Sequence, residues 1–149
     1  MSLKDEVEET IYRFSCAYDE FDVEEYVGTF LPDGVMQVES MRGNLRLEGL
    51  AAIRKFFPQA RGYRAASGVQ PRHLINNILV NRVSESEVES RCYMTFIRTH
   101  SDASAAVDHA GRYLDRLKKS GDRWLFSERR ILMDRDQNFE GRQPTFMPV

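Results

Sequence analysis

The chain has few cysteines and histidines, which excludes several common architectures. Its 149 residues include only two cysteines, Cys16 and Cys92, and three histidines. Two cysteines far apart, each within a periodic segment, indicate buried thiols in a reducing compartment rather than a disulfide framework. The histidines show no metal-ligand spacing and no Gly-rich phosphate loop occurs, so we expect no metal and no cofactor.

Long apolar runs and charge of a single sign are also lacking. No apolar run approaches the roughly 20 residues needed to cross a bilayer, and the segment MSLKDEVEET has no signal-peptide core. The 21 Lys and Arg residues nearly balance 23 Asp and Glu residues, which gives a net charge of −2 without a long basic tract. We therefore expect no nucleic-acid or membrane partner and a cytoplasmic location.

The first part of the chain is predicted to be helical. Apolar residues recur at Val7, Ile11, Phe14 and Tyr18, one face of an amphipathic helix from about Leu3 to Phe21. Asp22 then has the character of an N-cap for a second helix, Val23 to Phe30. The segment Leu31-Pro32-Asp33-Gly34 predicts a turn that ends this helix.

The remainder is rich in β-strand patterns. Two short strands, a short helix and a long loop (a lid, binding loop or interface arm) come first, at Val35–Glu39, Leu45–Glu48, Leu50–Phe57 and Gln59–Pro71. Four long strands follow at His73–Asn81, Val88–Thr99, His109–Lys119 and Arg123–Asp134, and the tail is irregular. The run Glu128-Arg129-Arg130 reads as an ordinary charged surface.

This order of elements predicts an α+β fold in a single domain, residues 1–149. Long consecutive strands favour a strongly curved antiparallel sheet, and the N-terminal helices pack over its concave face. Such a cone encloses a pocket between the first helix and the strands. Apolar residues on the outer sheet face lead us to expect a homo-oligomer.

Asp19 is the first candidate functional residue. It lies at the edge of the apolar stripe, near the C-terminus of the first helix, where the helix dipole is unfavourable for an acid. One interpretation is a carboxylate that orients a neighbouring base at the pocket. The other is a structural acid, either exposed or bonded to the next helix.

His73 begins the most apolar strand, HLINNILV, and is the second candidate. A lone histidine on a strand is more often structural than catalytic. Together, however, a carboxylate and an imidazole form a unit that moves protons near neutral pH. Strand alternation places His73 on the same face as Asn77, whose amide could line a polar pocket. The 54 positions between Asp19 and His73 leave their contact to the fold.

Further polar side chains could bind a substrate, although each is individually more typical of packing or surface. Tyrosine hydroxyls can polarise a carbonyl or hold a water, and Ser15 lies at the cavity edge of the first helix. The hydroxyl candidates are Tyr12, Tyr18, Tyr63, Tyr93, Tyr113 and Ser15; the charged ones are Arg98, His100, His109 and Arg130.

Three stretches carry a family resemblance: AYDEFDVEEYVGTFLPDG, RHLINNILV and GRYLDRLKKSGDRWLFSERRI. In this order they resemble the SnoaL-like branch of the nuclear transport factor 2-like (cystatin-like) superfamily, and most closely scytalone dehydratase and its bacterial relatives. The resemblance covers roughly Lys4 to Arg135. Its most regular motif is a fold marker: Gly111, Tyr113, Asp115, Leu117, Gly121 and Trp124.

The resemblance implies a deep, mostly apolar pocket and a dehydration that needs no cofactor. Asp19 matches the family's catalytic aspartate, His73 matches its histidine, and Tyr18 precedes the aspartate as in the family. The family's second histidine, on the following long strand, has no direct match: either Arg98 replaces it or His100 is a shifted equivalent. By the same analogy the oligomer is a dimer or trimer.

We therefore expect a cofactor-independent dehydratase or isomerase that acts on a small, mostly apolar cyclic substrate. The alternative is a non-catalytic small-molecule-binding or assembly protein on the same fold. In the enzyme reading, Asp19, His73 and Tyr18 are catalytic, and the expected substrate-binding residues are Tyr12, Ser15, Asn77, Tyr93 and Arg98.

Overall fold

The computed structural model describes residues 1–40, 43–57 and 68–134. Two helices come first, α1 (Leu3–Glu20) and α2 (Val23–Gly28), and a further helix covers residues 50–57. The strands are β1 (Phe30–Ser40), β2 (Gly43–Glu48), β3 (Gln70–Arg82), β4 (Glu87–Thr99), β5 (Ala105–Ser120) and β6 (Arg123–Met133). No helix among these residues is long and apolar enough to cross a membrane.

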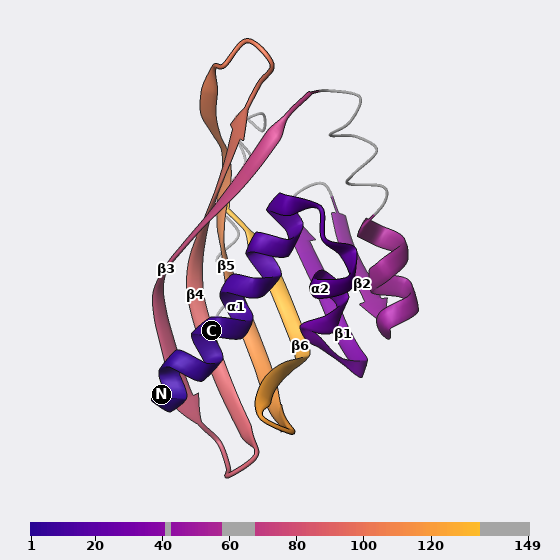
Figure 1. Cartoon of the computed structure of the whole chain (residues 1–149), viewed down its shortest axis with the longest axis vertical. Helices are drawn as coiled ribbons and strands as arrows, with labels where there is room; N and C mark the ends of the chain where they lie inside the picture. Colours follow the sequence, from indigo (N-terminus) through magenta and orange to yellow (C-terminus); the bar gives the residue numbers. More distant parts are fainter. Residues whose placement is uncertain (41–42, 58–67, 135–149) are drawn as a thin grey trace.

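The six strands form one curved, unclosed sheet in the order β2-β1-β6-β5-β4-β3. Strands β3 to β6 are an antiparallel meander, and α1 crosses the concave face of the sheet (Figure 1). The expected α+β class and the placement of the helices are thus confirmed. One pair differs from the expectation, because β1 runs parallel to β6. These strands are distant in sequence, so no hairpin forces them to be antiparallel.

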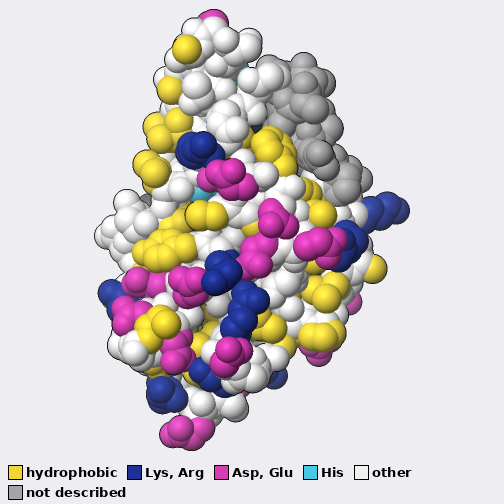
Figure 2. All heavy atoms as spheres, viewed as in Figure 1, with side chains coloured by type: hydrophobic (Ala, Val, Ile, Leu, Met, Phe, Trp, Pro, Cys, Tyr) yellow, Lys and Arg dark blue, Asp and Glu magenta, His cyan; other side chains and the backbone are white. Residues whose placement is uncertain are grey.

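Helix α1 is held to the sheet along its apolar stripe and at its N-terminal end. Phe14 lies at the centre of the stripe and packs against the rings of Tyr26, Phe30, Tyr113 and Phe126. Near the N-terminus, the indole Nε1 of Trp124 donates to a carboxylate oxygen of Glu6 at 2.8 Å. On the side from which α1 is seen, acidic and basic side chains are interspersed (Figure 2).

The segment between α2 and β1 differs from the predicted turn. Asp22 does cap α2, accepting from the backbone N–H of Glu25 at 3.0 Å, but α2 ends at Gly28 rather than Phe30. The predicted turn at 31–34 lies within β1, where the register with β6 shifts. A Cβ on Gly34 would come within 3.0 Å of several neighbouring atoms, so the irregular strand requires glycine at this position.

Arg129 contradicts the expectation of a charged surface at residues 128–130. Its side chain is fully buried and makes two hydrogen bonds of 2.8 Å to the carboxylate of Asp115, which is also fully buried. The guanidinium lies 4.0 Å from the ring centres of both Tyr113 and Phe126. Arginine tolerates this site because its flat, weakly hydrated cation stacks on aromatic rings while it pairs with a carboxylate.

The prediction that both cysteines are buried is wrong for Cys16, whose side chain is exposed. Cys92 is buried as expected, and both cysteines are free thiols. Residue 16 falls on the solvent side of α1. Most of the loop predicted at 59–71 and the irregular tail lie outside the described residues.

The buried ion pair predicts a large loss of stability when only one partner is removed. Asp115→Asn leaves the Arg129 cation without a countercharge, and we expect the free energy of unfolding to fall by about 3–5 kcal/mol. Urea denaturation measures it. The exposed pair of Glu9 and Arg13 on α1 is the control, and Glu9→Gln should change stability by about 0–1 kcal/mol. Equal effects of the two variants would contradict the prediction.

Candidate active site

A cavity of about 170 Å³ lies between the helices and the concave face of the sheet. Most of its lining is apolar or aromatic, and only a few side chains bring titratable or charged groups to it. The lining residues include Phe14, Tyr18, Tyr26, Met94, Phe96, Ile131 and Met133 among the former, and His73, Arg98 and His109 among the latter. An apolar cavity with a few convergent polar groups is the usual form of a small-molecule site.

Asp19 and His73 are in direct contact beside this cavity. The Nδ1 atom of His73 lies 2.7 Å from Oδ1 of Asp19, and both side chains are 8% exposed. The other carboxylate oxygen, Oδ2, accepts the backbone N–H of His73 at 2.8 Å. A charged Asp19 can only accept hydrogen bonds, so it selects the tautomer with the proton on Nδ1. The Nε2 atom of His73 is then the nitrogen available to a ligand.

The local fold explains why Asp19 faces the sheet. Helix α1 ends one residue later, and Phe21 takes a left-handed conformation (φ 64°) that reverses the chain into the cap of α2. The first residue of β3 is tied to the same place, because the Gln70 side-chain amide donates to the backbone oxygen of Asp19 at 3.1 Å. Asp19 is therefore buried by the junction of α1 and β3 rather than exposed at a helix end.

Aromatic rings fix the orientation of the His73 imidazole. Tyr18 packs edge-on against it with ring centres 5.0 Å apart, and Phe96 packs on it at 4.8 Å. Phe96 is the partner of His73 in the β3–β4 register, so both side chains emerge on the same face of the sheet. Tyr18, which precedes Asp19 in the chain, thus stands beside the imidazole.

His109 brings a second imidazole to the cavity, and the sequence did not single it out among the polar candidates. Its ring stacks on Phe96 with centres 4.7 Å apart and an angle of 15°, and its Nδ1 lies 2.7 Å from a carboxylate oxygen of Asp108. The same carboxylate oxygen lies 3.2 Å from a guanidinium nitrogen of Arg98. Phe96 therefore separates two imidazoles, each bound by a carboxylate through Nδ1.

A register shift accounts for this arrangement. Phe96 pairs with His109 but the next residue, Ile97, pairs with Val107, so Asp108 is an extra residue in β5. Neighbours in a regular strand point to opposite faces, whereas a bulge allows Asp108 to reach the ring of His109. In the sequence, only strand alternation indicated the position of His109. Alternate residues of a strand share a face, so His109 is expected on the face of Gly111 and Tyr113.

Three expected substrate-binding residues do not line the cavity. Asn77 and Tyr93 lie on the outer face of the sheet, and Tyr12 is 41% exposed on α1. For Asn77 the cause is a second register shift, between Asn76 and Leu79, at which Asn77 adopts a positive φ of 55°. The alternation that starts at His73 is broken there, so Asn77 faces outward.

The other polar candidates divide between the cavity and its surroundings. Arg98 lines the cavity, as expected of a substrate-binding residue. Ser15 is 3% exposed and does not line the cavity itself, but it lies against Tyr113, which does. His100 is exposed beyond the end of β4, so the second imidazole comes from His109 and not from a shifted His100.

Burial has opposite effects on two titrating groups near the site. It lowers the pKa of His109 below the ordinary value of 6.5, against the opposing effect of the hydrogen bond to Asp108. It raises the pKa of the Cys92 thiol to about 12, so this cysteine is protonated and has little nucleophilic character at neutral pH. Among residues 1–40, 43–57 and 68–134, no three His, Cys, Asp or Glu side chains are grouped as metal ligands.

The SnoaL-like domain model matches residues 1–130, and the chain therefore belongs to the SnoaL-like family. No curated protein matches the sequence. Solved structures do match it, and they define the class of fold as cystatin-like and nuclear transport factor 2-like.

Three of these structures show what kinds of protein are similar to this chain. A Catenulispora acidiphila protein in complex with S-DNPA is 27% identical, with a TM-score of 0.74 over 88% of this chain and 92% of that one. A putative scytalone dehydratase from Novosphingobium aromaticivorans is 19% identical, with a TM-score of 0.75 over 94% and 89% of the two chains. A nuclear transport factor 2-like protein of the same organism is 20% identical, with a TM-score of 0.72 over 87% and 80%.

The lowered pKa of His109 predicts how stability depends on pH. Below pH 6.5 the unfolded chain binds a proton at this residue that the folded chain resists, so the free energy of unfolding falls as the pH decreases. Replacing His109 by Gln removes this contribution. We expect urea denaturation between pH 7.5 and 5.5 to show a smaller decrease in stability for His109→Gln than for the wild type. An unchanged or steeper decrease in the variant would contradict the assignment.

Proposed function

We propose that the protein is a cofactor-independent lyase or isomerase that moves a proton on a small, mostly apolar cyclic ketone. The observation that carries the proposal is the contact between Asp19 and His73, 2.7 Å long, at the wall of an apolar cavity. A buried carboxylate that orients an imidazole and stabilises its protonated form is a functional unit of general acid–base catalysis.

In the proposed reaction, Nε2 of His73 accepts a proton from a carbon next to the carbonyl group. The electron pair of the broken C–H bond moves towards the carbonyl and forms an enolate. Asp19 stabilises the imidazolium that results. The ring of Tyr18 packs edge-on against His73 and lines the same cavity, and we assign to its hydroxyl the hydrogen bond to the carbonyl oxygen.

The destination of the proton separates the two reaction types. In a dehydration, the enolate expels a hydroxyl group from the β carbon, His73 returns the proton to that oxygen, and water leaves. In an isomerisation, His73 returns the proton to a different carbon and the double bond moves. Neutral His109, with its Nδ1–H directed at Asp108, accepts a hydrogen bond from a substrate hydroxyl through Nε2.

Simple cyclic ketones test the proposal. β-Hydroxycyclohexanone reports dehydration, and β,γ-unsaturated cyclohexenone reports isomerisation; both give the conjugated enone, which absorbs in the ultraviolet. We expect His73→Gln and Asp19→Asn to lower the rate by about 10²–10⁴-fold, the usual contribution of a general acid–base group.

The control is Glu20→Gln, because Glu20 is the exposed neighbour of Asp19 on α1 and pairs only loosely with Arg72, at 3.4 Å. This variant should keep the wild-type rate. If Asp19→Asn instead lowers the unfolding free energy while no ketone reacts even with the wild type, the pair is structural. The binding or assembly alternative would then be preferred.

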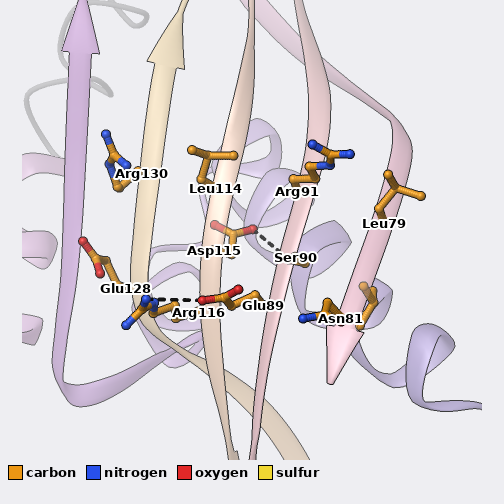
Figure 3. Close-up of a pocket in the computed structure, with 11 residues that line it drawn as sticks. Leu79, Asn81, Glu89, Ser90, Arg91, Leu114, Asp115, Arg116, Glu128 and Arg130 are labelled. Carbon is orange, nitrogen blue, oxygen red and sulfur yellow. Dashed lines mark hydrogen bonds and ion pairs between the residues drawn. The ribbon is translucent and has the colours of Figure 1, made fainter. Parts of the chain in front are cut away.

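We further propose that the outer face of the sheet contacts a second copy of the chain, in a dimer or trimer. A groove of about 730 Å³ lies on this face, and Figure 3 shows the side chains that line it. Neither Asp19 nor His73 is among them. Leu79 and Leu114 project there, and Leu79 is 56% exposed. Arginines and glutamates alternate around them, so the same surface offers both charges to an identical partner. They include Glu89, Arg91, Arg116, Glu128 and Arg130.

The oligomer is tested by a charge placed at the centre of this groove. Leu79→Glu should dissociate the assembly, because burying an unpaired carboxylate against a second copy is unfavourable. Light scattering coupled to size exclusion measures the mass. The control Leu45→Glu changes another exposed leucine (38%), on the edge strand β2, and should leave the mass unaltered. A monomeric wild type would refute the proposed contact.

A further inference from the structure

The size of the cavity limits what it can hold. Its volume of about 170 Å³ is close to that of an engineered apolar cavity of about 150 Å³ that binds benzene. Pockets for drug-sized ligands are larger, roughly 300–1,000 Å³. The space next to His73 is therefore close in size to one ring with small substituents.

The aromatic and imidazole side chains that line the cavity can pack against the faces and edges of a ligand ring. Phe96 lies between the two imidazoles, and the ring of Tyr18 faces it from α1 with ring centres 6.2 Å apart. In the strand register, His73 and His109 are each a direct partner of Phe96, so they are two strands apart, or roughly 9–10 Å between backbones. A single six-membered ring lying over Phe96 reaches both imidazoles with a polar group at each end.

The charges around the cavity disfavour an anionic ligand. Two carboxylates are present: Asp19 binds His73, and Asp108 binds both His109 and Arg98. Among the residues that the structure describes, Arg98 is the one arginine that lines the cavity, and its guanidinium is already 3.2 Å from Asp108. A ligand carboxylate would have to displace Asp108 and enter a site whose other carboxylate repels it.

We infer that the cavity selects a neutral, single-ring molecule that carries a carbonyl group for the His73 side and a hydroxyl group for His109. This inference names the substrate class of the proposed function and rests on the same site. It concerns binding, however, and can be tested without turnover. The hydroxyl is required because Nε2 of a neutral His109 offers only a lone pair.

Three stable probes separate size from charge: phenol, naphthol and benzoate. None of them can lose water, so their binding is independent of catalysis. Nuclear magnetic resonance titration follows the imidazole signals of His73 and His109, with the exposed His100 as the internal control. We expect phenol to shift the first two signals and to bind about tenfold more tightly than either competitor, a difference of about 1.4 kcal/mol.

A cavity-enlarging variant tests whether this cavity sets the limit. Met133 lines the cavity and is only half-buried. Met133→Ala therefore shortens the side chain and enlarges the cavity with little risk to folding. The variant should bind naphthol about tenfold or more tightly than the wild type does, because the shorter side chain adds space for the second ring. The matched control Leu114→Ala, in the outer groove, should leave the order of the three probes unchanged.

The outcomes separate the inference from the proposed function. Tighter binding of naphthol or benzoate than of phenol to the wild type would overturn the inference, as would shifts confined to His100. Failure of Met133→Ala to admit naphthol would overturn it too. Selective phenol binding by a protein that converts no cyclic ketone would uphold the inference and reject the enzyme.

Discussion

The two hydrogen bonds from His73 to Asp19 join the C-terminal end of α1 to β3, the strand at one edge of the sheet. At the other end of α1, Trp124 and Lys119 of the β5–β6 hairpin bind Glu6. The helix is thus fastened at both ends to opposite parts of a curved sheet. Between these points the sheet bends away, and a space remains that side chains do not fill. The contact that defines the candidate chemistry is also one that keeps the cavity open.

The second large electrostatic feature of the fold lies behind Phe14 and Tyr113, two residues of the cavity lining. Arg129 and Asp115 pair under α1, and the aromatic rings around the guanidinium replace the water it lost. Such a pair gives little net stability but strongly penalises arrangements that separate its partners. It therefore supports a single way of placing α1 on β5 and β6. Two of the family's fold-marker residues, Tyr113 and Asp115, belong to this cluster.

Local patterns in the sequence predicted most of the fold, because helix periodicity and strand alternation reflect burial on one face. The cap at Asp22, the meander and the inward direction of His73 all follow from such patterns. Asn77, Asp108 and the segment 31–34 could not be placed in this way, since each lies at a register shift that changes the alternation. Arg129 was misjudged for another reason. Its partner is on another strand, and a run of charged letters does not reveal a countercharge that only folding brings near.

The extra residue at Asp108 has a consequence for comparing members of this family. A bulge lets two neighbours on one strand act on the same side of a sheet, so the carboxylate of Asp108 and the imidazole of His109 can form a pair although they adjoin in the chain. A search of a sequence that assumes strict strand alternation would assign the two side chains to opposite faces and overlook the pair. Superposed side chains would recover it.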